Sequence, residues 1–279
     1  MCYEKKKIIG MAAIGVVVAI GALWLCFGEK IKILYTSLNS FKDENLAHTF
    51  QHTPEIQPTK KINKGENTLF SSNSMGKSFV SALMGIAVSE GYVESIEDPL
   101  GKYIPEFVGT ELENVPVRAC LQMASGIDFD EDKDMSGFSM RTLMGTPAMK
   151  AISKYGMQEE PYTYRRYLSI NTEILGQVIK NATRCGLAEY MEEKLWKKIG
   201  TDHDAYWTLS NGTELAMGGL SVSLRDYARF ARLYLNEGSY NGEQILPREW
   251  VKDSMDVSAE YSRPGANQDA YNVIGYGYQ

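Results

Sequence analysis

The first apolar pattern along the chain is one unbroken segment near its N-terminus. Residues Ile8 to Phe27 are 20 consecutive residues without a charge, and a helix of that length matches a hydrocarbon core of about 30 Å. Lys5 to Lys7 precede this segment, so the positive-inside rule places residues 1–7 in the cytoplasm and the rest of the chain outside. The pattern predicts a transmembrane anchor or uncleaved signal over residues 8–27. The alternative is a cleaved signal peptide, for which Ala19 and Gly21 supply small residues.

The chain beyond this segment carries the spacing of amphipathic helices in several places. Residues 28–50 are polar and mixed, which predicts a juxtamembrane connector ahead of a single domain over residues 51–279. Thr59 to Phe70 contains β-compatible residues around a glycine, which predicts one or two short strands. Apolar residues at helical spacing then predict a largely buried helix that ends near Gly91; they are Phe79, Val80, Leu83, Met84, Ala87 and Val88.

Further helices are predicted over residues 117–123, 172–183, 187–199 and 224–237, and a short one opens at Pro247. The chain therefore alternates few strands with many helices and lacks a regular strand–helix–strand rhythm. This order favours an α+β fold over a doubly wound sheet.

Composition and charge narrow the classes of function. The chain has 279 residues, 44% of them hydrophobic and 23% charged, which is typical of a globular protein. Its net charge is −6, with no basic stripe beyond the N-terminus, so no nucleic-acid partner is expected. The four cysteines and three histidines lack the spacing of a zinc site, which predicts free thiols and no metal. No histidine lies in a Gly-x-Ser-x-Gly context, so a Ser-His-Asp hydrolase has no support in the sequence.

A Ser-x-x-Lys element lies where the predicted strand ends and the buried helix begins. Ser74 and Lys77 share one helical face, so the amine can reach the hydroxyl. The free N–H groups and positive dipole end of a helix N-terminus suit a developing oxyanion. Burial disfavours the charged form of the amine and makes it a usable base. The same tetrapeptide also fits a capping serine followed by a solvated lysine, because isolated motifs recur by chance.

A second candidate element runs from Tyr167 to Thr172 and enters another helix. In an extended segment the side chains of Tyr167 and Ser169 point the same way. Tyr167 is then able to meet the Ser74–Lys77 pair and shuttle a proton. Ser169 is able to bind a substrate amide or orient Lys77. The plainer alternative is a packed tyrosine followed by capping residues.

Four segments in the same order resemble class C-type β-lactamases and related hydrolases. They are SSNSMGKSFVSALMGIAVSEGYVESIEDPLGKYIPEF, VRACLQMASGIDFDED, YLSINTEILGQVI and LAMGGLSVSLRDYARFARLYLNEGSYNGEQILPREWV. The resemblance runs from about Phe50 to Gln279, and the branch that the chain most resembles is that of the 6-aminohexanoate-dimer hydrolases and esterase-like relatives. It implies an antiparallel sheet flanked by helices, with a helical subdomain inserted and the site at their junction.

The resemblance also implies an acyl-enzyme mechanism. Ser74 attacks an amide, ester or lactam carbonyl, Lys77 and Tyr167 manage the proton, and water releases the acyl group; no metal or organic cofactor is implied. Whether Lys77 or Tyr167 is the base in acylation stays open. Ser169 and Asn171 are candidate substrate-binding residues, and Tyr164 and Trp207, with Tyr162, are candidates for the wall of the substrate site.

Two departures from the family pattern shape the expected activity. The usual Tyr-x-Asn has Ser169 at its third position, which favours small amides or esters over β-lactams. A late Lys/His-Thr/Ser-Gly element is absent, and Gly277 does not replace it. We therefore expect a C-terminally incomplete domain. A β-lactamase and a D-amino-acid peptidase are the alternatives within the superfamily. A non-catalytic, membrane-tethered peptide-binding or sensor protein is the alternative of another class. In each case the domain is expected to face the periplasm or the cell exterior from the inner membrane.

Overall fold

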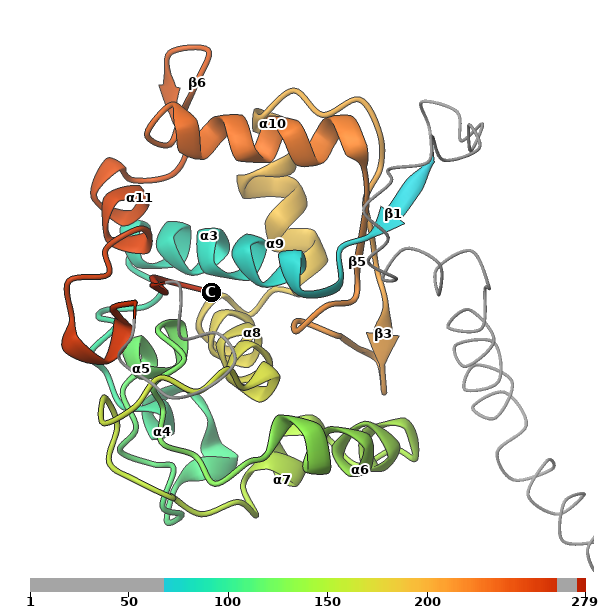
Figure 1. The fold of residues 1–279 in the computed structure, drawn as a ribbon. Coiled ribbons are helices and arrows are strands. Elements are labelled where there is room, and N and C mark those ends of the chain that lie inside the picture. Colours follow the sequence, from blue (N-terminus) through green and yellow to red (C-terminus); the bar gives the residue numbers. More distant parts are fainter. Residues whose placement is uncertain (1–67, 265–274) are drawn as a thin grey trace, which may run out of the picture. The chain divides into compact units, whose positions relative to one another are not determined.

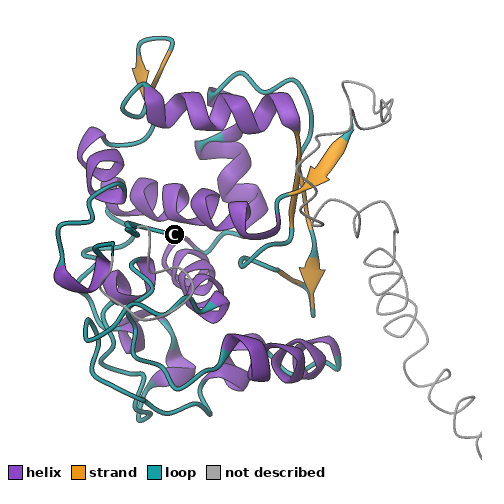
Figure 2. Ribbon diagram, viewed as in Figure 1, coloured by secondary structure: helices purple, strands orange, loops and turns teal. Residues whose placement is uncertain are grey.

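The computed structural model describes residues 68–264 and 275–279. All of them belong to one compact unit, Lys64–Gln279. The tail, anchor and connector predicted over residues 1–7, 8–27 and 28–50 lie outside the described residues. Within residues 68–264 and 275–279, no helix combines the length and apolar character needed to cross a membrane. Helices dominate this part and the strands form small antiparallel sheets, so the predicted α+β class is confirmed (Figure 2).

Helices and short strands alternate irregularly along the described chain. The α-helices are α3 (Gly76–Ser89), α4 (Leu100–Tyr103), α5 (Val117–Leu121), α6 (Glu131–Leu143), α7 (Ala148–Ile152), α8 (Ser169–Thr183), α9 (Leu187–Lys194), α10 (Leu224–Leu235) and α11 (Arg248–Ser254). The 3₁₀ turns are η2 (Asn73–Met75), η3 (Pro105–Phe107), η4 (Trp196–Lys198) and η5 (Glu260–Ser262). The strands are β1 (Leu69–Ser71), β2 (Tyr206–Trp207), β3 (Leu209–Ser210), β4 (Thr213–Glu214), β5 (Leu220–Ser223), β6 (Ser239–Tyr240) and β7 (Glu243–Gln244).

The main sheet places β5 between β1 and β2, with both pairs antiparallel. Phe70 pairs with Val222, and Trp207 pairs with Leu220. Strand β5 continues directly into α10, whose N-cap Ser223 accepts a hydrogen bond from the backbone N–H of Asp226. Because β1 leads into the turn before α3, pairing with β5 fixes the point at which α3 begins.

Helix α3 forms the centre of the core, with α10 on one side and α8 and α5 on the other (Figure 1). Nearly all of its residues from Phe79 to Ala87 are fully buried, which agrees with the prediction of a buried helix. The ring of Phe79 stacks on Phe230 of α10 with 3.7 Å between centroids. At Gly85 a Cβ atom would lie 2.5 Å from the Trp250 ring, so only glycine allows α11 to pack this closely.

The helix boundaries differ from the predicted ones in instructive ways. Helix α8 begins at Ser169, three residues before the predicted start, and the predicted helix over 187–199 divides into α9 and η4. Helices α4, α6 and α7 were not predicted. Helix α6 has a polar, solvated sequence with Gly137 in its middle, and only Phe138 and Thr142 are buried. Such a sequence gives no apolar stripe to recognise, and the helix depends on its N-cap Asp130, whose side chain accepts from two backbone N–H groups.

Candidate active site

The Ser74–Lys77 pair lies at the junction of β1, η2 and α3. Ser72 donates its backbone N–H to the carbonyl of Leu220 over 2.7 Å, which ties the turn to β5. Ser74 follows in η2 and is exposed, whereas Lys77 in the first turn of α3 is only 2% exposed. The Lys77 Nζ donates to Ser74 Oγ over 3.2 Å. The three-residue spacing therefore brings the amine to the hydroxyl as predicted, and it pairs a solvent-facing nucleophile with a buried amine.

Tyr167 completes a cluster with this pair. The Lys77 Nζ lies 5.2 Å from the centroid of the Tyr167 ring, which is within the range of a cation–π contact. Tyr167 lies two residues before the start of α8, which packs against α3. The three residues predicted to be catalytic, Ser74, Lys77 and Tyr167, thus gather in one place although they come from separate segments of the chain.

Tyr276 is a neighbour of this cluster that the sequence did not indicate. Its ring meets the ring of Tyr167 edge-on, with 6.4 Å between centroids. The segment 275–279 is held in place because Gln279 donates its backbone N–H to Leu121 and its side-chain amide to Cys120. Burial raises the pKa of the Tyr276 hydroxyl, so this residue stays neutral over the physiological range.

The Lys77 amine has a further partner on the loop before β5. It donates to the backbone carbonyl of Met217 over 2.6 Å. The backbone N–H of the same Met217 donates to Glu173 Oε1 over 2.9 Å. Glu173 lies on α8 and is only 6% exposed. Gly218 allows this loop to approach the serine turn, since a Cβ there would lie 3.1 Å from the carbonyl oxygen of Asn73.

The structure gives Ser169 and Asn171 partners other than those predicted. The Ser169 hydroxyl and backbone N–H both donate to the carboxylate of Glu131 at the start of α6. Ser169 is therefore held by a neighbouring helix, and its role toward Lys77 or a substrate amide stays a prediction. Asn171 is 0% exposed, and its amide donates to the sulfur of Met123. Its surroundings are those of a packed core residue, because it lies in the first turn of α8, where Ser169 to Leu175 are all buried.

The predicted wall residues occupy different environments. Tyr164 is 53% exposed, on the segment between α7 and α8. Trp207 lies in β2 and donates its indole N–H to the carbonyl of Leu215 over 2.9 Å. Trp207 therefore supports the loop that carries Met217, whereas Tyr164 is free to meet a ligand from solution.

The contact between Glu131 and Ser169 predicts a measurable contribution to stability. A carboxylate at a helix N-terminus is favourable, and hydrogen bonds to charged groups contribute about 1.5–3 kcal/mol. We expect Glu131→Ala to lower the free energy of unfolding by about 2 kcal/mol in urea denaturation. Asp132→Ala removes an exposed carboxylate from the same helical turn and serves as the matched control. An equal, small loss in both variants would show that the contact with Ser169 contributes nothing.

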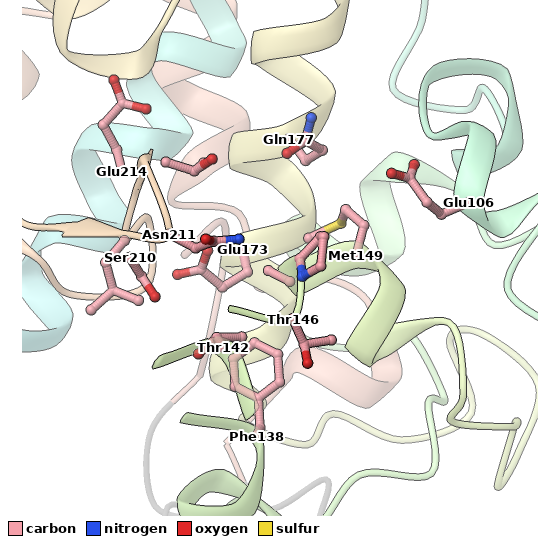
Figure 3. Close-up of a pocket in the computed structure, with 14 residues that line it drawn as sticks. Glu106, Phe138, Thr142, Thr146, Met149, Glu173, Gln177, Ser210, Asn211 and Glu214 are labelled. Carbon is pink, nitrogen blue, oxygen red and sulfur yellow. The ribbon is translucent and has the colours of Figure 1, made fainter. Parts of the chain in front are cut away.

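A cavity of about 80 Å³ lies on the other side of Glu173, between α8, α6 and the β3–β4 hairpin (Figure 3). Glu173 lies at its centre, with Asn211, Ser210 and Glu214 from the hairpin on one side and Thr142 and Phe138 of α6 below. Ser74, Lys77 and Tyr167 are not among its lining residues. The cavity is therefore separate from the Ser74–Lys77–Tyr167 cluster, and Glu173 lines the cavity while it contacts Met217 beside Lys77. Within the described ranges, no group of three or more His, Cys, Asp or Glu side chains is placed to hold a metal ion.

Comparison with known proteins shows the family to which the chain belongs. The profile of the family described as Beta-lactamase matches residues 47–279. The chain belongs to the beta-lactamase family. The 6-aminohexanoate-dimer hydrolase of Paenarthrobacter ureafaciens is 26% identical over 195 residues, which is 65% of this chain and 49% of the relative. The teichoic acid D-alanine hydrolase of Staphylococcus aureus is 27% identical over 149 residues, or 53% of this chain and 35% of the relative.

Solved structures support the same fold for this beta-lactamase family member. A D-stereospecific amidohydrolase from a Streptomyces species superimposes with a TM-score of 0.58 at 18% identity, over 77% of this chain and 71% of that one. The chain spans about half or less of the length of the two curated relatives described above. Membership of the family agrees with the resemblance noted in the sequence.

Proposed function

We propose that this protein hydrolyses a small amide or ester through an acyl-Ser74 intermediate. The observation that carries the proposal is the 3.2 Å hydrogen bond between the exposed Ser74 hydroxyl and the buried Lys77 amine, with the Tyr167 ring beside it. A nucleophile next to a general base, which is itself oriented by a third group, is the arrangement that covalent catalysis requires. The names of the relatives, an aminohexanoate-dimer hydrolase and a D-alanine hydrolase, favour acyl transfer to water.

The proposed reaction has two steps, acylation and deacylation of Ser74. Ser74 Oγ forms a bond to the substrate carbonyl carbon while its proton passes to the Lys77 amine, either directly or by way of the Tyr167 oxygen. The tetrahedral intermediate expels the amine or alcohol, which takes that proton. Water then attacks the acyl-serine ester, gives its proton to the same basic groups and releases the acid with Ser74 restored.

The substrate and the setting are part of the proposal. The third position of the tyrosine motif is Ser169, which carries a hydroxyl and no side-chain amide, and this hydroxyl donates to Glu131. This favours small amides or esters, with a β-lactam or a D-amino-acid peptide as the alternative substrates.

We also propose that residues 8–27 anchor the protein in the cytoplasmic membrane, with the domain on the outer side. This rests on the charge-free length of that segment and the lysines before it.

Covalent labelling tests the assignment of Ser74. The purified protein is incubated with a fluorophosphonate or with a penicillin, and the mass of the intact chain is recorded. We expect one fluorophosphonate adduct on the unmodified protein and none on Ser74→Ala. Ser71→Ala removes an exposed hydroxyl three residues away and should label normally. Labelling that persists in Ser74→Ala, or a folded protein that never labels, would overturn the proposal in favour of a binding protein without turnover. The penicillin adduct distinguishes the β-lactam alternative.

A further inference from the structure

We propose that Glu173 is a positioning residue for Lys77, acting through the backbone of Met217 and through its own negative charge. The inference rests on the proposed function, because it concerns how the same amine is prepared for its work. Glu173 is neither the nucleophile nor in contact with Ser74. It reaches the site through one residue of the loop before β5.

The contacts form a continuous chain from the carboxylate to the nucleophile. Glu173 Oε1 accepts from the Met217 N–H at 2.9 Å, the Met217 carbonyl accepts from Lys77 Nζ at 2.6 Å, and Nζ lies 3.2 Å from Ser74 Oγ. The N–H and the carbonyl belong to the same residue, so the carboxylate that holds one also places the other. A shift of this loop would move the acceptor of the Lys77 amine directly.

The hydrogen bond to the Met217 carbonyl determines how the amine of a neutral Lys77 is oriented toward Ser74. An uncharged amine has two N–H bonds and one lone pair. When one N–H is directed to the Met217 carbonyl, the rotation of the amine is restricted, and the lone pair is able to face the Ser74 hydroxyl. A basic amine that rotates freely would hold this orientation only part of the time, and orientation of this kind is a major part of catalysis.

Glu173 is also the buried carboxylate that joins the Lys77 cluster to the cavity. Burial raises its pKa to about 7, against the opposing effects of the Met217 N–H and the charge of Lys77. Glu106 of η3 and Glu214 of β4 line the cavity around Glu173 (Figure 3). Lys180 of its own helix lines a second, smaller cavity that Glu173 also lines. Two of these three are acidic, and Lys77 is the cation whose charge favours the ionised carboxylate.

Two substitutions distinguish the effect of the Glu173 charge from the effect of its side-chain length. Glu173→Gln keeps an oxygen acceptor for the Met217 N–H but removes the charge. The loss of a nearby negative charge disfavours the ammonium form of Lys77, so the limb of the pH profile that follows this amine should move to lower pH by about one unit. On that limb the labelling rate at a fixed pH then changes about tenfold. Glu173→Asp keeps the charge but is one methylene shorter. It should leave the limb in place and slow labelling about tenfold or more, because Met217 is released.

The test is the rate of fluorophosphonate labelling across pH in the full chain, for the unmodified protein and both variants. Glu106→Gln, which removes an exposed carboxylate from the same cavity, should leave the profile unchanged. An unmoved limb in Glu173→Gln, or a Glu173→Asp rate equal to that of the unmodified protein, would overturn the proposal, and circular dichroism confirms that each variant is folded.

A second measurement separates this inference from the proposed function. The titration of the Lys77 Cε resonance by ¹³C NMR does not need an active enzyme. A lower titration midpoint in Glu173→Gln supports the role of Glu173 even if no variant is ever labelled. An unchanged midpoint in a protein that is labelled at Ser74 would overturn the role of Glu173, but the proposal of a serine hydrolase would stand.

Discussion

Replacing Lys77 with arginine is expected to slow covalent labelling at Ser74 by about 10²–10⁴-fold at neutral pH. Arginine retains the positive charge, but its guanidinium stays protonated at every accessible pH and has no lone pair to accept the serine proton. It is also too bulky for a site in which Lys77 is 2% exposed between Ser74 and the Met217 carbonyl. Lys133→Arg makes the same exchange at a side chain that is 82% exposed and controls for the chemistry of the substitution.

The size of this effect also informs the choice between the two candidate bases. If Lys77 takes the proton itself, the arginine variant loses the base and keeps only the remaining features of the site. If the Tyr167 oxygen takes the proton, a permanent cation beside its ring at 5.2 Å preserves much of the rate. A labelling rate of Lys77→Arg within about fivefold of that of the unmodified protein would therefore contradict the role of Lys77 as the base. Tyr167 would then be the base in acylation.

Phe79→Ala is expected to lower the free energy of unfolding by about 4 kcal/mol, as large-to-small changes of buried aromatic residues do. Phe79 is 1% exposed and stacks on Phe230 of α10. Its ring also approaches Tyr227 at 6.1 Å and Trp196 of η4 at 6.3 Å between centroids. It is therefore the side chain that joins the helix bearing Lys77 to the elements that follow β5 and α9.

Urea denaturation followed by tryptophan fluorescence measures this loss. Phe79→Leu keeps most of the apolar volume and is expected to cost about 1 kcal/mol or slightly more. The difference between the two variants isolates the cavity and the lost aromatic contacts from the general effect of a change in the core. A loss below about 1 kcal/mol in Phe79→Ala would show that the cluster is not packed as described.

The sequence predicted contacts between residues that lie close together in the chain. Ser74 and Lys77 are three residues apart on one helical turn, so their meeting follows from helix geometry alone. The buried helix α3 and the amphipathic α10 could be predicted because apolar side chains recur along them at helical spacing. The family pattern added Tyr167, whose segment lies far from Ser74 in sequence but beside it in the fold.

Contacts between distant segments could not be predicted in the same way. Met217 meets Lys77 from 140 residues away, and its carbonyl carries no side-chain signal in the sequence. Glu131 is separated from Ser169 by 38 residues and lies on a polar helix that periodicity does not reveal. Glu173 resembles a surface glutamate of an amphipathic helix until the loop before β5 is folded over it. These residues are fixed by tertiary packing, which no local pattern records.

The dependence of Lys77 on Met217 makes the reactivity of Ser74 a property of the tertiary structure. The η2 turn and the start of α3 hold the serine and the lysine at the right spacing, yet the carbonyl that orients the amine comes from the segment between β4 and β5. A newly made chain in which α3 has formed but that segment has not yet docked carries the motif without an oriented base. Its serine is then an ordinary alcohol, so a covalent adduct at Ser74 marks molecules that have completed folding.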